Sequence, residues 1–179
     1  MRDFLEVINS RVSVKSYQST PVAKELIEKI VEAGTHAPTG LNKQSPIILA
    51  VTNKEVRDRL SYLNAGKDPF KRADPFKRAD PFYNAPVVLV VLADKSVPTH
   101  VYDGSLVMEN MLLAAHSLGL GACWIHRAKE TFEMEEGKRL LKDLGIEGEY
   151  EGIGNCIVGY PDVVPAKKPR KERWVYYVE

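Results

Sequence analysis

The chain has 179 residues and a mass of 20.1 kDa, and its 25 Lys and Arg against 24 Asp and Glu give a formal charge of +1. Hydrophobic residues make up 44% of the sequence, so we expect one folded domain over residues 1–179 rather than extensive disorder. The balanced charge argues against a dedicated nucleic-acid-binding protein, which would carry a strong basic excess. The longest apolar run, residues 85–93, is too short to cross a bilayer, and neither a secretory signal nor a disulfide framework is visible. We therefore expect a cytoplasmic protein that neither spans a membrane nor binds nucleic acid.

The first third of the chain alternates helical and strand patterns. Asp3 is placed to cap the free backbone amides of a helix whose first residues are 4–8. Apolar residues at helical spacing predict a second helix that ends at Gly34. The apolar run 46–51 predicts a buried strand, and residues 54–60 predict a short helix.

The remaining elements predict an α+β fold. The β-branched run 86–92 is typical of a strand covered on both faces. Asp103 is expected to cap a helix that extends to Leu118 and is apolar nearly all round, so it should be buried on every side, preferably in a subunit interface. Further elements are expected at residues 122–125 (strand), 134–144 (helix) and 152–158 (strand). The irregular alternation favours a mixed three-layer arrangement.

A six-residue repeat interrupts this pattern. Residues 68–73 recur as residues 74–79, and the unit begins again at Asp80-Pro81-Phe82. The simpler interpretation is a duplication tolerated in a surface loop, residues 68–82. The alternative is a lid whose cations attract an anionic substrate or a nicotinamide phosphate: Lys71, Arg72, Lys77 and Arg78.

Common catalytic motifs are absent from the sequence. Gly119-Leu120-Gly121 begins like a dinucleotide fingerprint but follows a helix and lacks the third small residue. There is no phosphate-binding loop, no HExxH and no GxSxG motif, and the four histidines have no metal-ligand spacing. His116 lies on the apolar helix, where a hydrogen-bonded packing role is expected. We therefore expect neither a metal site nor a catalytic triad.

Three separated segments could converge on one phosphate-bearing ligand. Along an extended stretch, Arg11, Ser13 and Lys15 share one face and offer a guanidinium fork, a hydroxyl and an ammonium to an anion. Residues 37–44 form a turn with two carboxamides, whose donors and acceptors suit the edge of a flavin or a nucleobase. Residues 167–171 form a dense basic cluster.

Together with other motifs, these segments resemble the FMN-dependent nitroreductase family over nearly the whole chain. The likeness is carried by Arg11-Val12-Ser13-Val14-Lys15-Ser16-Tyr17, Ala37-Pro38 through Asn42 and Gln44, Ala85-Pro86-Val87-Val88, Leu113 through Ile125, Gly159-Tyr160-Pro161 and Lys168-Pro169-Arg170. The chain departs from the family at Lys15, where many members have Arg, at Ser45 before Pro46, and at His126-Arg127.

The resemblance implies a mixed, mostly antiparallel central sheet flanked by helices, in an intertwined homodimer with FMN at the interface. It implies that residues 38–42 come from the partner subunit, that the helix over residues 103–118 forms the dimer core, and that Lys15 approaches the N1 and O2 side of the flavin. The residues implied to bind the cofactor are Arg11, Val12, Ser13, Lys15, Pro38, Thr39, Gly40, Asn42, Gln44, Trp124, Ile125, His126, Lys168 and Arg170. No catalytic side chain is implied, because the flavin itself carries the hydride.

The implied activity is a ping-pong, two-electron reduction of nitroaromatic, quinone or similar electron-poor acceptors, with NADH or NADPH as the hydride donor. One alternative is a related flavin enzyme that acts on an enone, a free flavin or a halogenated aromatic. A second is an FMN-binding module without turnover, and a third is a structural dimer without flavin.

Overall fold

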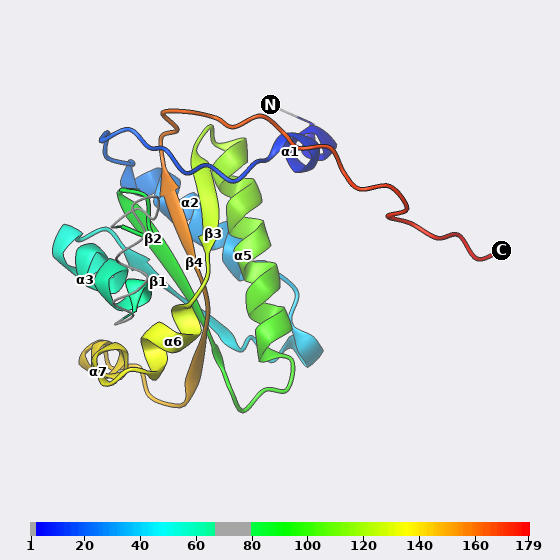
Figure 1. The fold of residues 1–179 in the computed structure, drawn as a ribbon. Helices are drawn as coiled ribbons and strands as arrows, with labels where there is room; N and C mark the ends of the chain where they lie inside the picture. The colour runs from blue at the N-terminus through cyan, green and yellow to red at the C-terminus, as the bar shows by residue number, and fades with distance from the viewer. Residues whose placement is uncertain (1–2, 67–79) are drawn as a thin grey trace.

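The computed structural model describes residues 3–66 and 80–179, which fold into three layers around an antiparallel sheet (Figure 1). The strand order is β1-β2-β4-β3, and each neighbouring pair runs antiparallel. The strands are β1 (Pro46–Val51), β2 (Val87–Asp94), β3 (Gly121–Ile125) and β4 (Tyr150–Gly159). This arrangement confirms the expected α+β class.

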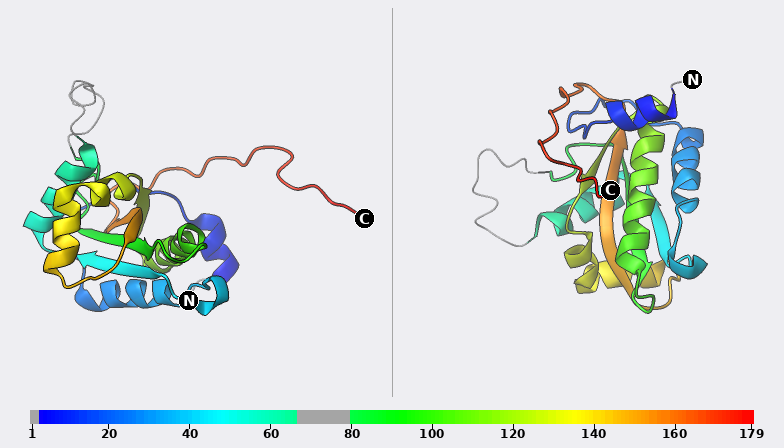
Figure 2. Two further views of the ribbon diagram at one scale, coloured as in Figure 1. Left: turned by 90° about the horizontal axis from the view of Figure 1, so that it is seen from below. Right: turned by 90° about the vertical axis from the view of Figure 1, so that its right-hand side faces the viewer.

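Helices cover both faces of the sheet (Figure 2). One face carries α2 (Lys24–Thr35) and α5 (His100–Ser117). The other face carries α3 (Lys54–Ala65), α6 (Ala128–Glu133) and α7 (Glu135–Asp143). The remaining helices are α1 (Phe4–Ser10), which contacts α5, and the 3-10 turn η1 (Gly40–Asn42). Among the described residues, no helix is both long and apolar enough to span a membrane.

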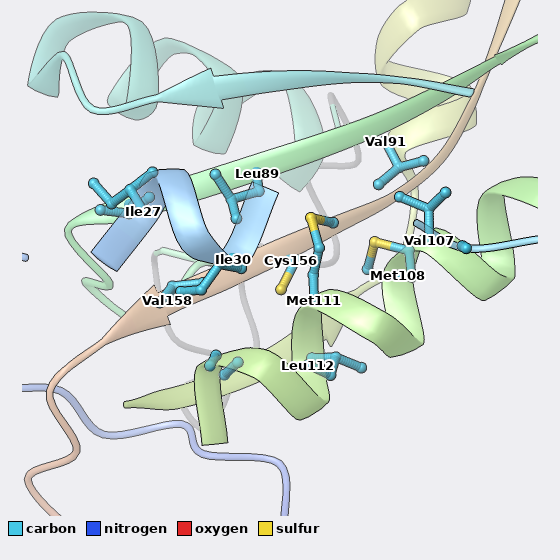
Figure 3. Packing of buried hydrophobic residues seen from close by; sticks show 14 of the residues in the cluster. Ile27, Ile30, Leu89, Val91, Val107, Met108, Met111, Leu112, Cys156 and Val158 are labelled. Atoms are coloured by element: carbon cyan, nitrogen blue, oxygen red, sulfur yellow. The ribbon is translucent and has the colours of Figure 1, made fainter. Parts of the chain in front are cut away.

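Strand β2 divides the core into two clusters because its side chains alternate between the faces of the sheet. Leu89 and Val91 pack with α2 and α5, where Met108 and Met111 are fully buried (Figure 3). The intervening residues Val88, Val90 and Leu92 pack against α3, α6 and α7. The unbroken apolar run is therefore buried on both sides, as the sequence predicts.

Several helix boundaries differ from the sequence expectation. Asp3 occupies the N-cap position of α1, but its side chain makes no capping hydrogen bond. Helix α3 extends to Ala65, five residues beyond the expected end. Helix α5 begins at His100, so Asp103 lies inside its first turn and does not cap it.

Helix α5 is not buried on every side within one chain, and its burial in a subunit interface stays a prediction. Its core-facing side is buried, but Tyr102 is 72% exposed and Leu106 is 45% exposed in the single chain. Val101 next to them is also exposed. The apolar character of α5 is therefore only partly explained by the core of one chain.

Most of the expected loop over residues 68–82, including its four cations, lies outside the described residues. Its last three residues are part of the packed structure. Phe82 is fully buried, and Asp80 forms an ion pair with the buried Arg57 and accepts a hydrogen bond from Ser61 at 2.6 Å. The backbone N–H of Asn84 also donates to Asp80, at 2.7 Å. Asp80 and Phe82 therefore anchor the chain shortly before β2 begins at Val87.

Candidate functional site

Residues 11–15, the cationic segment, lie along the outer edge of β3. Ser13 bridges Ala122, and the Val14 N–H donates to the Ala122 carbonyl at 3.0 Å. Val14 is buried against Gly121, where a Cβ atom would lie 2.8 Å from the Val14 Cβ. Ser13 and Lys15, on either side of Val14, are exposed. The local pairing therefore holds the polar side chains at the surface of the sheet edge.

The charges of the cationic segment affect the buried thiol of Cys123 on β3. Burial raises the pKa of the Cys123 thiol, while a hydrogen bond with Ser13 and the positive charges of Lys15 and Arg11 act in the opposite direction. The two cations and the hydroxyl thus act on the same buried thiol of β3. A site of this composition attracts a phosphate or another anion.

Each of the two cations already has a neighbour. The Arg11 Nε lies 3.8 Å from a carboxylate oxygen of the half-exposed Glu109, and the Lys15 ammonium lies 5.4 Å from the centre of the Tyr83 ring. An exposed ion pair at that distance is worth about 0–1 kcal/mol, less than the roughly 1.5–3 kcal/mol of a hydrogen bond to a charged group. A bound phosphate can therefore displace Glu109 from Arg11.

Residues 38–45, the 38–45 loop, lie at the start of β1 and are held by internal hydrogen bonds. The Gln44 N–H donates to the Thr39 hydroxyl at 3.0 Å, and the Gln44 carboxamide donates to Asn42 at 3.2 Å. Leu41, Asn42 and Gln44 all have positive φ angles, between 49° and 53°, which are uncommon for residues with side chains. A loop with three such residues keeps its shape only where the surroundings fix it.

The carboxamides of this loop line a cavity of about 400 Å³. Asn42 and Gln44 contribute part of its polar lining, and Val31 and Ile48 contribute part of its apolar wall. The cavity lies between α2, the loop and β1. The loop therefore offers both donors and acceptors beside an apolar surface.

The cationic segment and the 38–45 loop are not brought together within one chain. They lie at opposite edges of the sheet, and β1 and β3 are three strand spacings, about 14 Å, apart. The loop contacts Asp103 at the start of α5, whereas Ser10 contacts His116 near the other end of that helix, at 2.8 Å. Asp103 and His116 are about 20 Å apart along the helix axis. The contact with Ser10 also confirms the hydrogen-bonded role expected for His116.

Trp124, Ile125 and His126 continue from the cationic segment along β3 and past its end. The Trp124 indole packs on Gly154, where no side chain would fit. The Ile125 carbonyl accepts a hydrogen bond from the buried Asn155 at 3.4 Å, and His126 is exposed. Trp124 and Ile125 thus form a half-buried wall that extends from the cationic segment.

The C-terminal basic cluster passes close to α1 and then leaves the body of the protein. The Lys167 ammonium donates to the Asn9 carbonyl, two residues before Arg11. Lys168 and Arg170 follow in an exposed tail that leads away from the folded layers (Figure 1). The tail begins near the cationic segment, but its basic side chains do not close over that segment in a single chain.

Sequence reasoning missed Asp103, Glu109 and Tyr83 as neighbours of the candidate residues. Asp103 was expected to be a helix cap, but its carboxylate accepts a hydrogen bond from the Gly40 N–H at 2.9 Å. Tyr83 directly follows the repeat, and Glu109 lies on the apolar helix. No local pattern links any of the three to a partner more than sixty residues away.

Comparisons with known proteins agree on one family. A model of the nitroreductase family matches residues 8–160. A Methanothermobacter thermautotrophicus protein, whose name describes an NADH dehydrogenase or NAD(P)H nitroreductase, is 33% identical over 126 residues, covering 68% of this chain and 60% of that protein. A Bacillus subtilis protein named FMN reductase, NAD(P)H, is 28% identical over 180 residues, covering 95% of this chain and 70% of that protein. The crystal structure of a Bacteroides fragilis nitroreductase with bound FMN has a TM-score of 0.86 and 27% identity, with all of both chains covered.

Proposed function

The chain belongs to the nitroreductase family, and we propose that it is a flavoprotein oxidoreductase that binds FMN and uses NADH or NADPH to reduce nitroaromatics, quinones or similar electron-poor acceptors. The observation that carries the proposal is the cationic segment on β3, next to the wall formed by Trp124 and Ile125. A structural neighbour at 27% identity was crystallised with FMN, which supports the same cofactor here. We further propose that residues 1–179 act as one domain.

The donor set of the chain fits FMN. Arg11, Ser13 and Lys15 can all donate hydrogen bonds, as a phosphate requires. Ser13 and Lys15 are exposed and Arg11 is partly exposed, on a segment that pairs with the edge of β3. Lys168 and Arg170 can add charge from the exposed tail, which begins beside Asn9. The carboxamides of the 38–45 loop suit the alternating donors and acceptors of the flavin ring.

The separation of these groups within one chain favours a site built by two chains. We propose an intertwined homodimer in which the 38–45 loop of one subunit meets the cationic segment of the other. The exposed apolar residues Tyr102 and Leu106 on α5 supply a surface for this contact. The tail supplies a second one, because Trp174 is 66% exposed and Tyr176 is 78% exposed.

The residues of the chain would then have distinct tasks. Arg11, Ser13, Lys168 and Arg170 hold the phosphate, while Lys15 places a positive charge where the reduced ring is negative and so increases its electron affinity. Trp124 and the 38–45 loop orient the ring and exclude water. When bound, FMN supplies the hydride chemistry, so no catalytic side chain or metal ion is required.

The proposal is tested by an absorption spectrum of the purified protein followed by anaerobic titration with NADH and with NADPH. We expect a bound flavin that is bleached stoichiometrically by at least one of the two nicotinamides. A protein that retains no flavin after incubation with FMN and removal of the free cofactor would refute the proposal. A bound flavin that neither nicotinamide bleaches would indicate a binding module, and initial rates with nitroaromatics, quinones, enones and free flavin would identify the acceptor class.

A further inference from the structure

Asp103 is a buried carboxylate that the proposed chemistry does not use. It is 2% exposed and lies in the first turn of α5. Three donors converge on it: the Gly40 N–H at 2.9 Å, the Ser45 hydroxyl at 2.8 Å and the Thr99 hydroxyl at 3.1 Å. Two of these donors belong to the 38–45 loop, so the carboxylate links the loop to the helix.

Ser45 attaches the end of the loop to the sheet as well. Its carbonyl accepts a hydrogen bond from the Asp94 N–H at 3.0 Å, while its hydroxyl donates to Asp103. Ser45 is only 4% exposed. Near the other end of the loop, a Cβ atom at Gly40 would overlap the Thr99 hydroxyl, so the backbone approaches α5 as closely as a glycine permits.

The hydrogen bonds keep the carboxylate ionised. Burial alone would raise the pKa of Asp103, but the hydrogen bonds from Gly40, Ser45 and Thr99 outweigh it and hold the pKa below its ordinary value. Asp103 is therefore a buried anion whose main partners are the loop and the turn before α5. Between its two attachments, the loop carries three residues with positive φ angles that need support from outside.

We propose that Asp103 is a positioning residue that fixes the shape of the 38–45 loop through Gly40 and Ser45, and that it thereby sets the FMN affinity of the site completed by the partner subunit. This inference rests on the proposed function. It assigns a role to Ser45, one of the positions at which this chain departs from the family pattern. It also predicts that a change in one subunit alters the site whose cationic segment belongs to the other.

The first test compares two buried serines that each donate to an aspartate. Ser45→Ala removes a hydrogen bond to Asp103. The control Ser61→Ala removes the hydrogen bond from α3 to Asp80, and α3 lies on the opposite face of the sheet from α5. FMN dissociation constants are measured by flavin fluorescence on apo-protein, with thermal unfolding measured in parallel. We expect Ser45→Ala to weaken FMN binding by about tenfold, and Ser61→Ala to leave it within about twofold at a similar loss of thermal stability.

Substitutions of Asp103 separate hydrogen bonding from general packing. Asp103→Leu keeps the branched skeleton of the side chain but removes every acceptor, so we expect FMN binding to weaken by more than about tenfold. Asp103→Asn keeps an acceptor for the Gly40 N–H and an amide for the two hydroxyls, and it should restore most of the affinity. Equal losses in both variants would contradict a positioning role that depends on these hydrogen bonds.

The second test is complementation between subunits. Arg11→Ala and Asp103→Leu chains are co-expressed, so each mixed dimer has one site with both defects and one site with neither. With random assortment, about one quarter of all sites should bind FMN with wild-type affinity. If Asp103 acted on the site of its own chain, no wild-type sites would appear and the inference would be wrong.

The outcomes distinguish the inference from the proposed function. A wild-type protein that does not bind FMN would overturn both. A wild-type protein that binds FMN, with Ser45→Ala no weaker than Ser61→Ala, would overturn only the role of Asp103.

Discussion

Gly121 offers a direct test of how β3 holds the cationic segment. A Cβ atom at this position would lie 2.8 Å from both the Cβ and the Cγ1 of Val14, whereas carbon atoms in contact are normally about 3.5–4.0 Å apart. In Gly121→Ala, Val14 must therefore retreat by about 1 Å. Its backbone hydrogen bond to Ala122, now 3.0 Å long, would then exceed the normal range.

The displacement should affect ligand binding more than folding. Overpacking of this size costs about 1–3 kcal/mol of the free energy of unfolding. Ser13 and Lys15 move with Val14, and each misplaced charge-assisted contact to a phosphate loses about 1.5–3 kcal/mol. We therefore expect FMN to bind roughly ten- to a hundredfold more weakly to Gly121→Ala.

The measurement is the FMN dissociation constant, with urea unfolding as the measure of stability. Val14→Ala is the matched control, because it loses packing at the same contact without pushing the segment away, and it should bind FMN nearly as well as the wild type. Adding Val14→Ala to Gly121→Ala removes the two methyl groups nearest the new Cβ and should recover part of the affinity. An unchanged dissociation constant in Gly121→Ala would refute this account of the segment.

Three further substitutions test other parts of the structure. Arg11→Ala should weaken FMN binding about ten- to a hundredfold by removing one charge-assisted contact; an unchanged dissociation constant would contradict its phosphate-binding role. Leu106→Asp places a charge on the exposed apolar face of α5, so ultracentrifugation should show monomers that no longer retain FMN, and an intact dimer would argue against α5 as the interface. Asp80→Asn removes one of the two carboxylates that pair with the buried Arg57, leaving Asp58, and should reduce the free energy of unfolding by about 1.5–3 kcal/mol at neutral pH. Although burial raises the pKa of Asp80, its hydrogen bonds hold it below the ordinary value, so this stabilisation is lost as the pH falls through the folded-state pKa and the two proteins should converge in acid.

The sequence predicts most of the sheet because its strands carry strong local signals. The run that forms β2 is β-branched and uninterrupted, and the residues of β1 and β3 were likewise recognisable as short apolar runs. Helix α3 was predicted too short because Ser61 and Asn64 look like surface residues. Both are buried through distant hydrogen bonds, Ser61 to Asp80 and Asn64 to Asn155.

The candidate site was predictable only in part, for a similar reason. The alternation of polar residues indicated that Arg11, Ser13 and Lys15 lie together, and the structure pairs this segment with the edge of β3 at Ala122. The attachment of Gly40 to Asp103 depends on how η1 and α5 meet in space, and the two residues are 63 positions apart. An aspartate near a helix start is more often a cap than a tether for a remote loop, so the local pattern favoured the wrong role.

Because Asp80 and Phe82 anchor the chain before β2, the fold does not depend on the length of the segment that precedes them. Each repeat unit begins with Asp-Pro-Phe, so excision of one unit would still deliver the same triplet, followed by Tyr83 and Asn84, to the start of β2. The aspartate would still meet Arg57, and the phenylalanine would still fill the same space in the core. Insertion or deletion of a whole six-residue unit should therefore leave the sheet unchanged.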